Sequence, residues 1–175
     1  AIEPSGKRTM LALDVSGSME VGVIAGIPGL SPRKASAAMA MVTARTEKQW
    51  QVIGFSHQLV DVPITPRQRL DDVVRTIARI PMGGTDCSLP MRGAIGMSLE
   101  VDTFVVYTDT ETWFGPIHPH QALNEYRKRS GIAAKLAVVG LTSTGFTIAD
   151  PSDAGMIDVV GFDSAAPSVL ADFAR

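Results

Sequence analysis

Apolar residues occur along the chain in short continuous runs, separated by longer amphipathic segments. Such runs are typical of strands that are buried on both faces of a parallel sheet. We predict five of these strands, at residues 10–13, 51–55, 104–107, 136–139 and 157–160. Another run at 59–62 follows too closely for a crossover helix, so it should form an antiparallel hairpin with 51–55, turning near residues 56–58.

Between the strands, apolar residues recur at the spacing of amphipathic helices, and several of these segments begin with a cap. Three starts are marked by a cap followed by proline, at Ser31-Pro32, Thr65-Pro66 (a capping box with Gln68) and His118-Pro119. Two more helices are expected around 91–95 and from about Pro167, and Gly131 should end the one that His118 opens. Residues expected to face inward are Ala35, Ala38, Met39, Val42, Leu70, Val73, Val74, Ile77, Met91, Ala94, Ile95, Ala122, Leu123, Tyr126, Val169, Leu170 and Phe173.

Strands that alternate with helices predict one α/β domain: a doubly wound, mostly parallel sheet with helices on both faces, spanning residues 1–175. The 45% hydrophobic and 19% charged residues are the balance of an ordinary globular protein. The single Cys87 excludes an internal disulfide, and we interpret it as a buried structural thiol. No apolar run or signal-like start indicates a membrane, so we expect a cytosolic protein.

Polar side chains gather in three loops that should meet at the carboxyl edge of this sheet, where doubly wound folds bind ligands. Asp14, Ser16 and Ser18 follow the first strand, Thr85 follows a Gly-Gly pair, and Asp109 follows strand 104–107. Three hydroxyls and two carboxylates are hard oxygen ligands for Mg²⁺ or Mn²⁺. Neutral hydroxyls next to the ion would leave its charge partly uncompensated, so that it attracts an outside carboxylate.

The Asp14-x-Ser16-x-Ser18 sequence, the loop threonine and the Thr-Asp turn resemble the metal-ion-dependent adhesion site of von Willebrand factor A domains. The resemblance implies Ser16, Ser18 and Thr85 as direct ligands of Mg²⁺ (or Mn²⁺ or Ca²⁺). Asp14 and Asp109 would act through water. It also implies a six-stranded, Rossmann-like sheet in the order 3-2-1-4-5-6 with the third strand antiparallel.

Four further segments, at 43–48, 80–91, 125–128 and 142–151, resemble the A domain of the 60 kDa Ro autoantigen family. The similarity extends from about residue 10 to 173. It implies that this chain is the C-terminal A domain of a longer RNA-binding protein, whose helical repeats bind small noncoding Y RNAs in RNA quality control. Its expected partners are an Asp or Glu carboxylate of a protein ligand and that repeat region, with no membrane and no catalysis.

Several alternatives stay open. The Asp14 loop could be a helix-capping turn, or the site could belong to a Mg²⁺-dependent phosphatase with Asp86 as general base. Direct RNA binding is disfavoured by the net charge of −2. Beside the metal, Glu111, Trp113 and Phe114 are candidate partner-binding residues, although both rings could instead pack on a helix. The segment 21–30 should cover one side of the site, with Glu20 as a solvated loop carboxylate.

Overall fold

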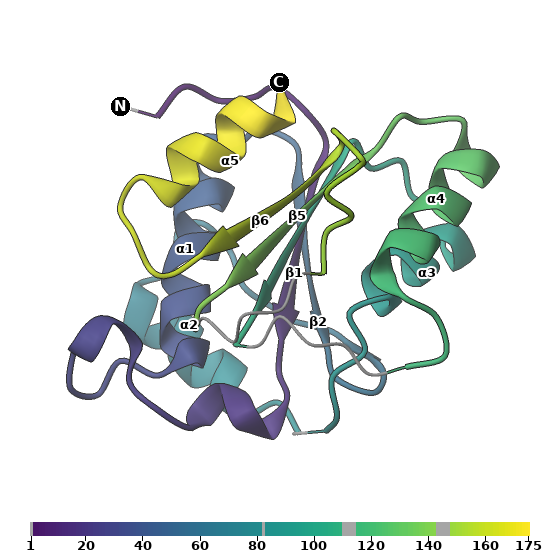
Figure 1. Ribbon diagram of the computed structural model, residues 1–175. Coiled ribbons are helices and arrows are strands. Elements are labelled where there is room, and N and C mark those ends of the chain that lie inside the picture. The colour runs from purple at the N-terminus through teal and green to yellow at the C-terminus, as the bar shows by residue number, and fades with distance from the viewer. Residues whose placement is uncertain (1, 82, 110–114, 143–147) are drawn as a thin grey trace.

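The computed structural model describes residues 2–81, 83–109, 115–142 and 148–175, and it centres on a six-stranded sheet (Figure 1). The strands are β1 (Thr9–Asp14), β2 (Trp50–Phe55), β3 (Leu59–Val60), β4 (Thr103–Thr108), β5 (Lys135–Gly140) and β6 (Met156–Val160). Their order is β3-β2-β1-β4-β5-β6. Only the β2–β3 pair is antiparallel, which confirms the predicted order and the predicted hairpin.

Helices cover both faces of the sheet. They are α1 (Pro32–Thr46), α2 (Leu70–Ala78), α3 (Leu89–Gly96), α4 (Pro119–Ser130) and α5 (Ala166–Ala174), with short 3₁₀ helices η1 (Gly17–Glu20) and η2 (Ile24–Gly26). Figure 1 shows α1, α2 and α5 on one side, and α3 and α4 on the other. No helix in these described ranges is long and apolar enough to cross a bilayer.

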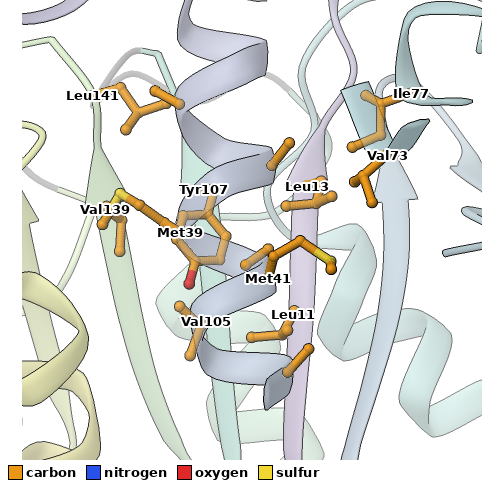
Figure 2. Packing of buried hydrophobic residues seen from close by; sticks show 14 of the residues in the cluster. Leu11, Leu13, Met39, Met41, Val73, Ile77, Val105, Tyr107, Val139 and Leu141 are labelled. Carbon is orange, nitrogen blue, oxygen red and sulfur yellow. The ribbon is translucent and has the colours of Figure 1, made fainter. Parts of the chain in front are cut away.

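Alternate residues of each central strand supply two separate cores, because successive strand side chains point to opposite faces. In β1, Leu11 and Leu13 pack in the cluster beneath α1, whereas Met10 and Ala12 pack beneath α3 and α4. Figure 2 shows Met39 and Met41 of α1 among the side chains of the first cluster. Each fully buried aliphatic side chain contributes about 1.5–3 kcal/mol, so this layer fixes the strand ends that carry the polar loops.

The predicted caps are confirmed for two helices. The Ser31 hydroxyl accepts from the Lys34 N–H at the start of α1 (3.4 Å). At the start of α4, His118 Nδ1 accepts from the His120 N–H, and the His118 N–H donates to Gln121 Oε1 (3.0 Å). Gly131 ends α4 with a φ of 72°, in the left-handed region that favours glycine.

The predicted start of α2 at Pro66 is wrong, because the helix begins at Leu70. The Thr65 N–H does donate to Gln68 Oε1 (2.7 Å), but these residues form an isolated turn. In a helix the Pro66 carbonyl would accept from the N–H of residue 70. Here it accepts from Arg45 Nε of α1 (2.9 Å), and the Gln68 carbonyl accepts from Arg45 Nη2. A contact between residues distant in sequence therefore keeps residues 66–69 outside the helix.

Three side chains predicted to face inward are exposed instead: Val42, Leu70 and Val169, at 36%, 41% and 41%. On α1 the buried face is wide and built largely from small residues and methionines, so Val42 lies outside it. Strand β3 is also shorter than predicted, ending at Val60. Val62 instead turns into the core beneath α1 and α2, so the chain leaves the sheet edge.

Candidate metal centre

The carboxyl ends of β1 and β4 lie side by side, and they carry two of the predicted site residues, Asp14 and Asp109. The parallel register pairs Leu13 with Tyr107, so Asp14 lies level with Thr108, the residue before Asp109. Thr108 Oγ1 donates to Asp14 Oδ2 over 2.7 Å. Both Asp14 and Asp109 are buried. Because β1 connects through α1 to β2 on one side while β4 lies on its other side, this is the switch point at which doubly wound sheets bind ligands.

The loop after β1 is folded around the Asp14 carboxylate. Asp14 Oδ1 accepts from the Ser16 N–H (2.8 Å), and Ser16 Oγ lies 3.1 Å from Ser18 Oγ. Ser16 is buried and Ser18 is exposed. Adjacent ligands of an octahedral ion with bonds of about 2.0–2.1 Å are roughly 2.9 Å apart, so this spacing fits two neighbouring ligand positions.

The pKa of the Asp14 carboxyl is raised to about 6, mainly by burial and in smaller part by the charge of Asp109. Hydrogen bonds from Ser16 and Thr108 act in the opposite direction, because they stabilise the charged form. Among the ion pairs of the described residues, none joins Asp14 or Asp109 to a basic side chain. The two carboxylates therefore have no counter-ion in the described part of the chain.

Thr85 lies in a loop that is fastened to the end of β2. The next residue, Asp86, donates its N–H to the Ser56 carbonyl (2.8 Å). A Cβ on Gly83 would collide with the His57 ring, so glycine allows the loop to approach. Burial raises the pKa of the adjacent Cys87 thiol well above its usual value, and Asp14, Asp86 and Asp109 add to the shift. Because Ser56 follows the end of β2 and the Val15 N–H donates to the Phe55 carbonyl (2.9 Å), the Thr85 loop lies at the same edge of the sheet as the loop after β1.

Asp86 is buried and occupied by structural contacts. Its Oδ1 accepts from both the N–H and the hydroxyl of Ser88 (3.0 and 2.6 Å), and its Oδ2 lies 3.5 Å from Arg92 Nη1. Gly115 packs against this carboxylate, since a Cβ there would lie 2.5 Å from Asp86 Cγ. These contacts favour a role for Asp86 in holding two loops together over a role as general base.

Arg33, which is 1% exposed, also supports the site, although it is not among the residues predicted from the sequence. Its Nη1 donates to the Ile77 carbonyl of α2, and its Nη2 donates to the Val15 carbonyl, between Asp14 and Ser16. Its Nε lies 3.0 Å from Glu20 Oε1. Glu20 is exposed, as we expected of a solvated loop carboxylate, but it is also ion-paired. An arginine in the first turn of a helix opposes the helix dipole, and that conflict is the signal that could have identified it.

The residues present fit a divalent cation. Asp109 Oδ1 is buried and has no hydrogen-bond partner among the described residues, although the Asp109 carbonyl accepts from the Thr142 hydroxyl. A buried carboxylate oxygen without a partner is costly unless an ion or an ordered water satisfies it. Nowhere in the described ranges do three His, Cys, Asp or Glu side chains form a metal cluster, so a cation here would rely on hydroxyl oxygens.

The predicted partner-binding residues, Glu111, Trp113 and Phe114, lie outside the described residues.

A family model for the Ro60 vWA domain matches residues 8–174 of the chain. The chain belongs to this family. It is 51% identical over 174 residues to the RNA-binding protein RO60 of Deinococcus radiodurans, with 99% of this chain and 33% of that protein covered. It is 42% identical over 171 residues to the RNA-binding protein RO60 of Caenorhabditis elegans, covering 97% and 26%. The chain thus spans about a third or less of the length of these relatives.

Solved structures show the same fold. The Ro (RSR) protein of Deinococcus radiodurans superposes with a TM-score of 0.90 at 50% identity, covering 99% of this Ro60 vWA domain and 35% of that chain. Proximal thread matrix protein 1 of the mussel byssus matches at 12% identity with a TM-score of 0.65, covering 99% and 48%. A form of that mussel protein in which the metal-ion-dependent adhesion site (MIDAS) motif is occupied by zinc matches at 16% identity with a TM-score of 0.54. The match covers 99% of this chain and 46% of that chain. At such identities the mussel protein shares the fold alone.

Proposed function

We propose that this domain binds ligands without turnover, capturing a partner's Asp or Glu carboxylate through a divalent cation. Mg²⁺ is the ion we expect, with Mn²⁺ or Ca²⁺ as substitutes. Ser16, Ser18 and Thr85 would hold it directly, and Asp14 and Asp109 would act through bound water. The cation would supply the positive charge that attracts the incoming carboxylate.

The main support for the proposal is the combination at the ends of β1 and β4: paired hydroxyls beside two buried carboxylates that have no basic partner among the residues that the structure describes. Ser16 Oγ and Ser18 Oγ already lie at ligand spacing, and Asp109 Oδ1 is buried without a described partner. A capping turn would account for the Asp14 hydrogen bonds alone. It would not account for a second buried carboxylate at the same edge, because burying an uncompensated charge destabilises a fold.

In the whole protein we propose that this domain serves a Ro-family RNA-binding protein of RNA quality control. Small noncoding Y RNA would be bound by the helical-repeat region that we expect elsewhere in that protein. The carboxylate could come from another protein or from the same polypeptide. We also propose that Glu111, Trp113 and Phe114 contribute to the partner surface, and that the protein is cytosolic.

Calorimetric titration with Mg²⁺ tests the proposal. The purified domain should bind one Mg²⁺ per chain, and Ser16→Ala combined with Thr85→Ala should abolish that binding because two of three direct ligands are lost. Ser168→Ala, an exposed serine of α5, is the matched control and should bind as the unaltered domain does. Equal Mg²⁺ affinity in the double variant would overturn the assignment of these ligands.

The same preparation tests the hydrolase alternative. A phosphatase built on Asp14 would cleave p-nitrophenyl phosphate in a Mg²⁺-dependent reaction, and replacement of Asp14 would stop it. We expect no cleavage above the rate of buffer with Mg²⁺. Turnover that needs both Mg²⁺ and Asp14 would replace ligand capture with catalysis as the function of this edge.

A further inference from the structure

An exposed apolar cluster lies directly beside the proposed metal loop. Val21, Val23 and Ile27 are 73%, 53% and 47% exposed, and we call these three side chains the apolar ridge. Eight large hydrophobic side chains of the described residues are exposed, and three of them fall within this seven-residue segment. Single exposed apolar side chains are ordinary, but a local cluster of them indicates an interaction site.

The ridge is held in shape by its own backbone and by one buried anchor. The Val21 N–H donates to the Ser18 carbonyl (2.9 Å), which ties the ridge to the loop that carries the proposed ligands. Ile24 is 1% exposed, and its N–H donates to the Leu30 carbonyl (2.9 Å). Ala25 has a φ of 52°, an unusual conformation for a residue with a Cβ. The segment thus buries Ile24 while it directs its neighbours outward.

The charge of this segment suits an acidic partner. Between residues 19 and 30 the only charged side chain is Glu20, and it lies 3.0 Å from Arg33 Nε. No free negative charge on the segment would repel a carboxylate that approaches the cation. Val21 is three residues from Ser18, a span of at most about 11 Å even if extended. Val21 is therefore within reach of the residues that flank a carboxylate bound to the ion.

We propose that the apolar ridge and the cation form one composite surface, which recognises a protein segment whose acidic residue is flanked by apolar side chains. This inference rests on the function proposed above, and it specifies the partner of that site. The cation would bind the carboxylate, and the ridge would select among carboxylates by burying what flanks them. Burying roughly 55 Å² of apolar surface changes affinity about tenfold, so three side chains can supply substantial selectivity.

Two synthetic peptides with a single central Asp test the proposal, one with leucines at the flanking positions and one with serines there. In Mg²⁺ the leucine-flanked peptide should bind the domain at least about tenfold more tightly by fluorescence anisotropy. In a ridge variant, with Val21→Ser, Val23→Ser and Ile27→Ser, that preference should disappear while the calorimetric Mg²⁺ affinity is unchanged. The matched control carries Leu70→Ser, Val160→Ser and Val169→Ser, which are similarly exposed elsewhere, and it should keep the preference.

The outcomes separate the two proposals. Mg²⁺-dependent binding of both peptides with equal affinity, or a preference that survives in the ridge variant, would overturn the role of the ridge and leave the metal site standing. Failure to bind Mg²⁺ at all would overturn the proposed function and the ridge proposal with it. If sedimentation shows that the unaltered domain dimerises and the ridge variant does not, the ridge is a contact between copies and the acidic partner is wrong.

Discussion

The two ends of the sheet treat their acidic residues in opposite ways. At the amino end, Asp102 accepts from Arg8 Nε, Arg8 Nη2 and the Arg8 N–H at 2.8, 2.7 and 2.9 Å. These bonds lower the pKa of the Asp102 carboxyl below its usual value. At the carboxyl end, Asp14 is more deeply buried, has no basic partner in the described residues, and has a pKa raised to about 6.

This difference distinguishes a stabilising ion pair from a candidate binding site. A carboxylate that is satisfied by arginine contributes to the fold and has little charge left for a ligand. Carboxylates that are buried without a counter-ion cost free energy in the isolated chain, and a bound cation would recover it. Arg33, a basic side chain that contacts the loop after β1, is directed to backbone carbonyls and Glu20, so it holds the metal loop without neutralising Asp14.

The largest expected effect comes from removing the arginine at each end. Arg33→Met should lower the free energy of unfolding by about 3 kcal/mol, because the Val15 and Ile77 carbonyls lose their donors inside the protein. Arg8→Met should cost about 1 kcal/mol or less, since the Arg8 side chain is 35% exposed and water can replace it. Urea denaturation of both variants provides the measurement. Equal losses in the free energy of unfolding would show that the buried Arg33 stabilises the fold no more than the exposed Arg8 does.

Next in size is the exchange of each carboxylate for its amide. In Asp14→Asn the carbonyl can still accept from the Ser16 N–H, and the amide can donate to the Thr108 hydroxyl, so the change removes mainly charge. Mg²⁺ affinity should fall roughly 100-fold, as expected for a group that positions metal-bound water. Asp102→Asn is the matched control and should leave Mg²⁺ affinity unchanged. A smaller effect at Asp14 than at Asp102 would contradict the contrast between the two ends.

The smallest expected effect is a difference between the two ends of the sheet in how the stability of the fold depends on pH. Asp102 has a lowered pKa in the folded state, so its contribution is present above the unfolded pKa of about 4 and is lost as the pH falls through the folded value. Asp14 has a raised folded pKa, so its contribution is present below about pH 4 and is lost as the pH rises through about 6. Metal-free urea curves between pH 3 and 7 should therefore show Asp14→Asn gaining relative stability with rising pH and Asp102→Asn losing it. The same sign in both variants would refute this account.

Much of the fold could be predicted, because its signals are local. Strand 104–107 is a continuous apolar run, and α4 begins with His118 before proline and ends at Gly131. The strand order came from resemblance, and the structure confirms it. The start of α2 could not be predicted, because the Arg45 guanidinium donates to carbonyls that lie 21 and 23 residues away in the sequence. Local propensity does not report such long-range competition.

In the candidate site, too, features that depend on neighbouring residues could be predicted, and contacts between residues distant in sequence could not. Asp14, Ser16 and Ser18 are recognisable because they lie within five residues of one another after a strand. The Thr108 bond to Asp14 joins residues 94 positions apart, and the Arg8–Asp102 pair spans the same separation. Such pairs become visible only when parallel register brings the strand ends level. Arg33 could be flagged as an unfavourable charge at a helix start, but the Val15 and Ile77 carbonyls that it contacts could not be foreseen.

The most direct test of the central claim is a crystal of the domain soaked in Mn²⁺ and measured for anomalous scattering. The account predicts one strong peak at the ends of β1 and β4, within bonding distance of Ser16 Oγ, Ser18 Oγ and Thr85 Oγ1, with Asp14 and Asp109 reaching it through water. A map with no peak there, or with these hydroxyls directed away from one another, would contradict it.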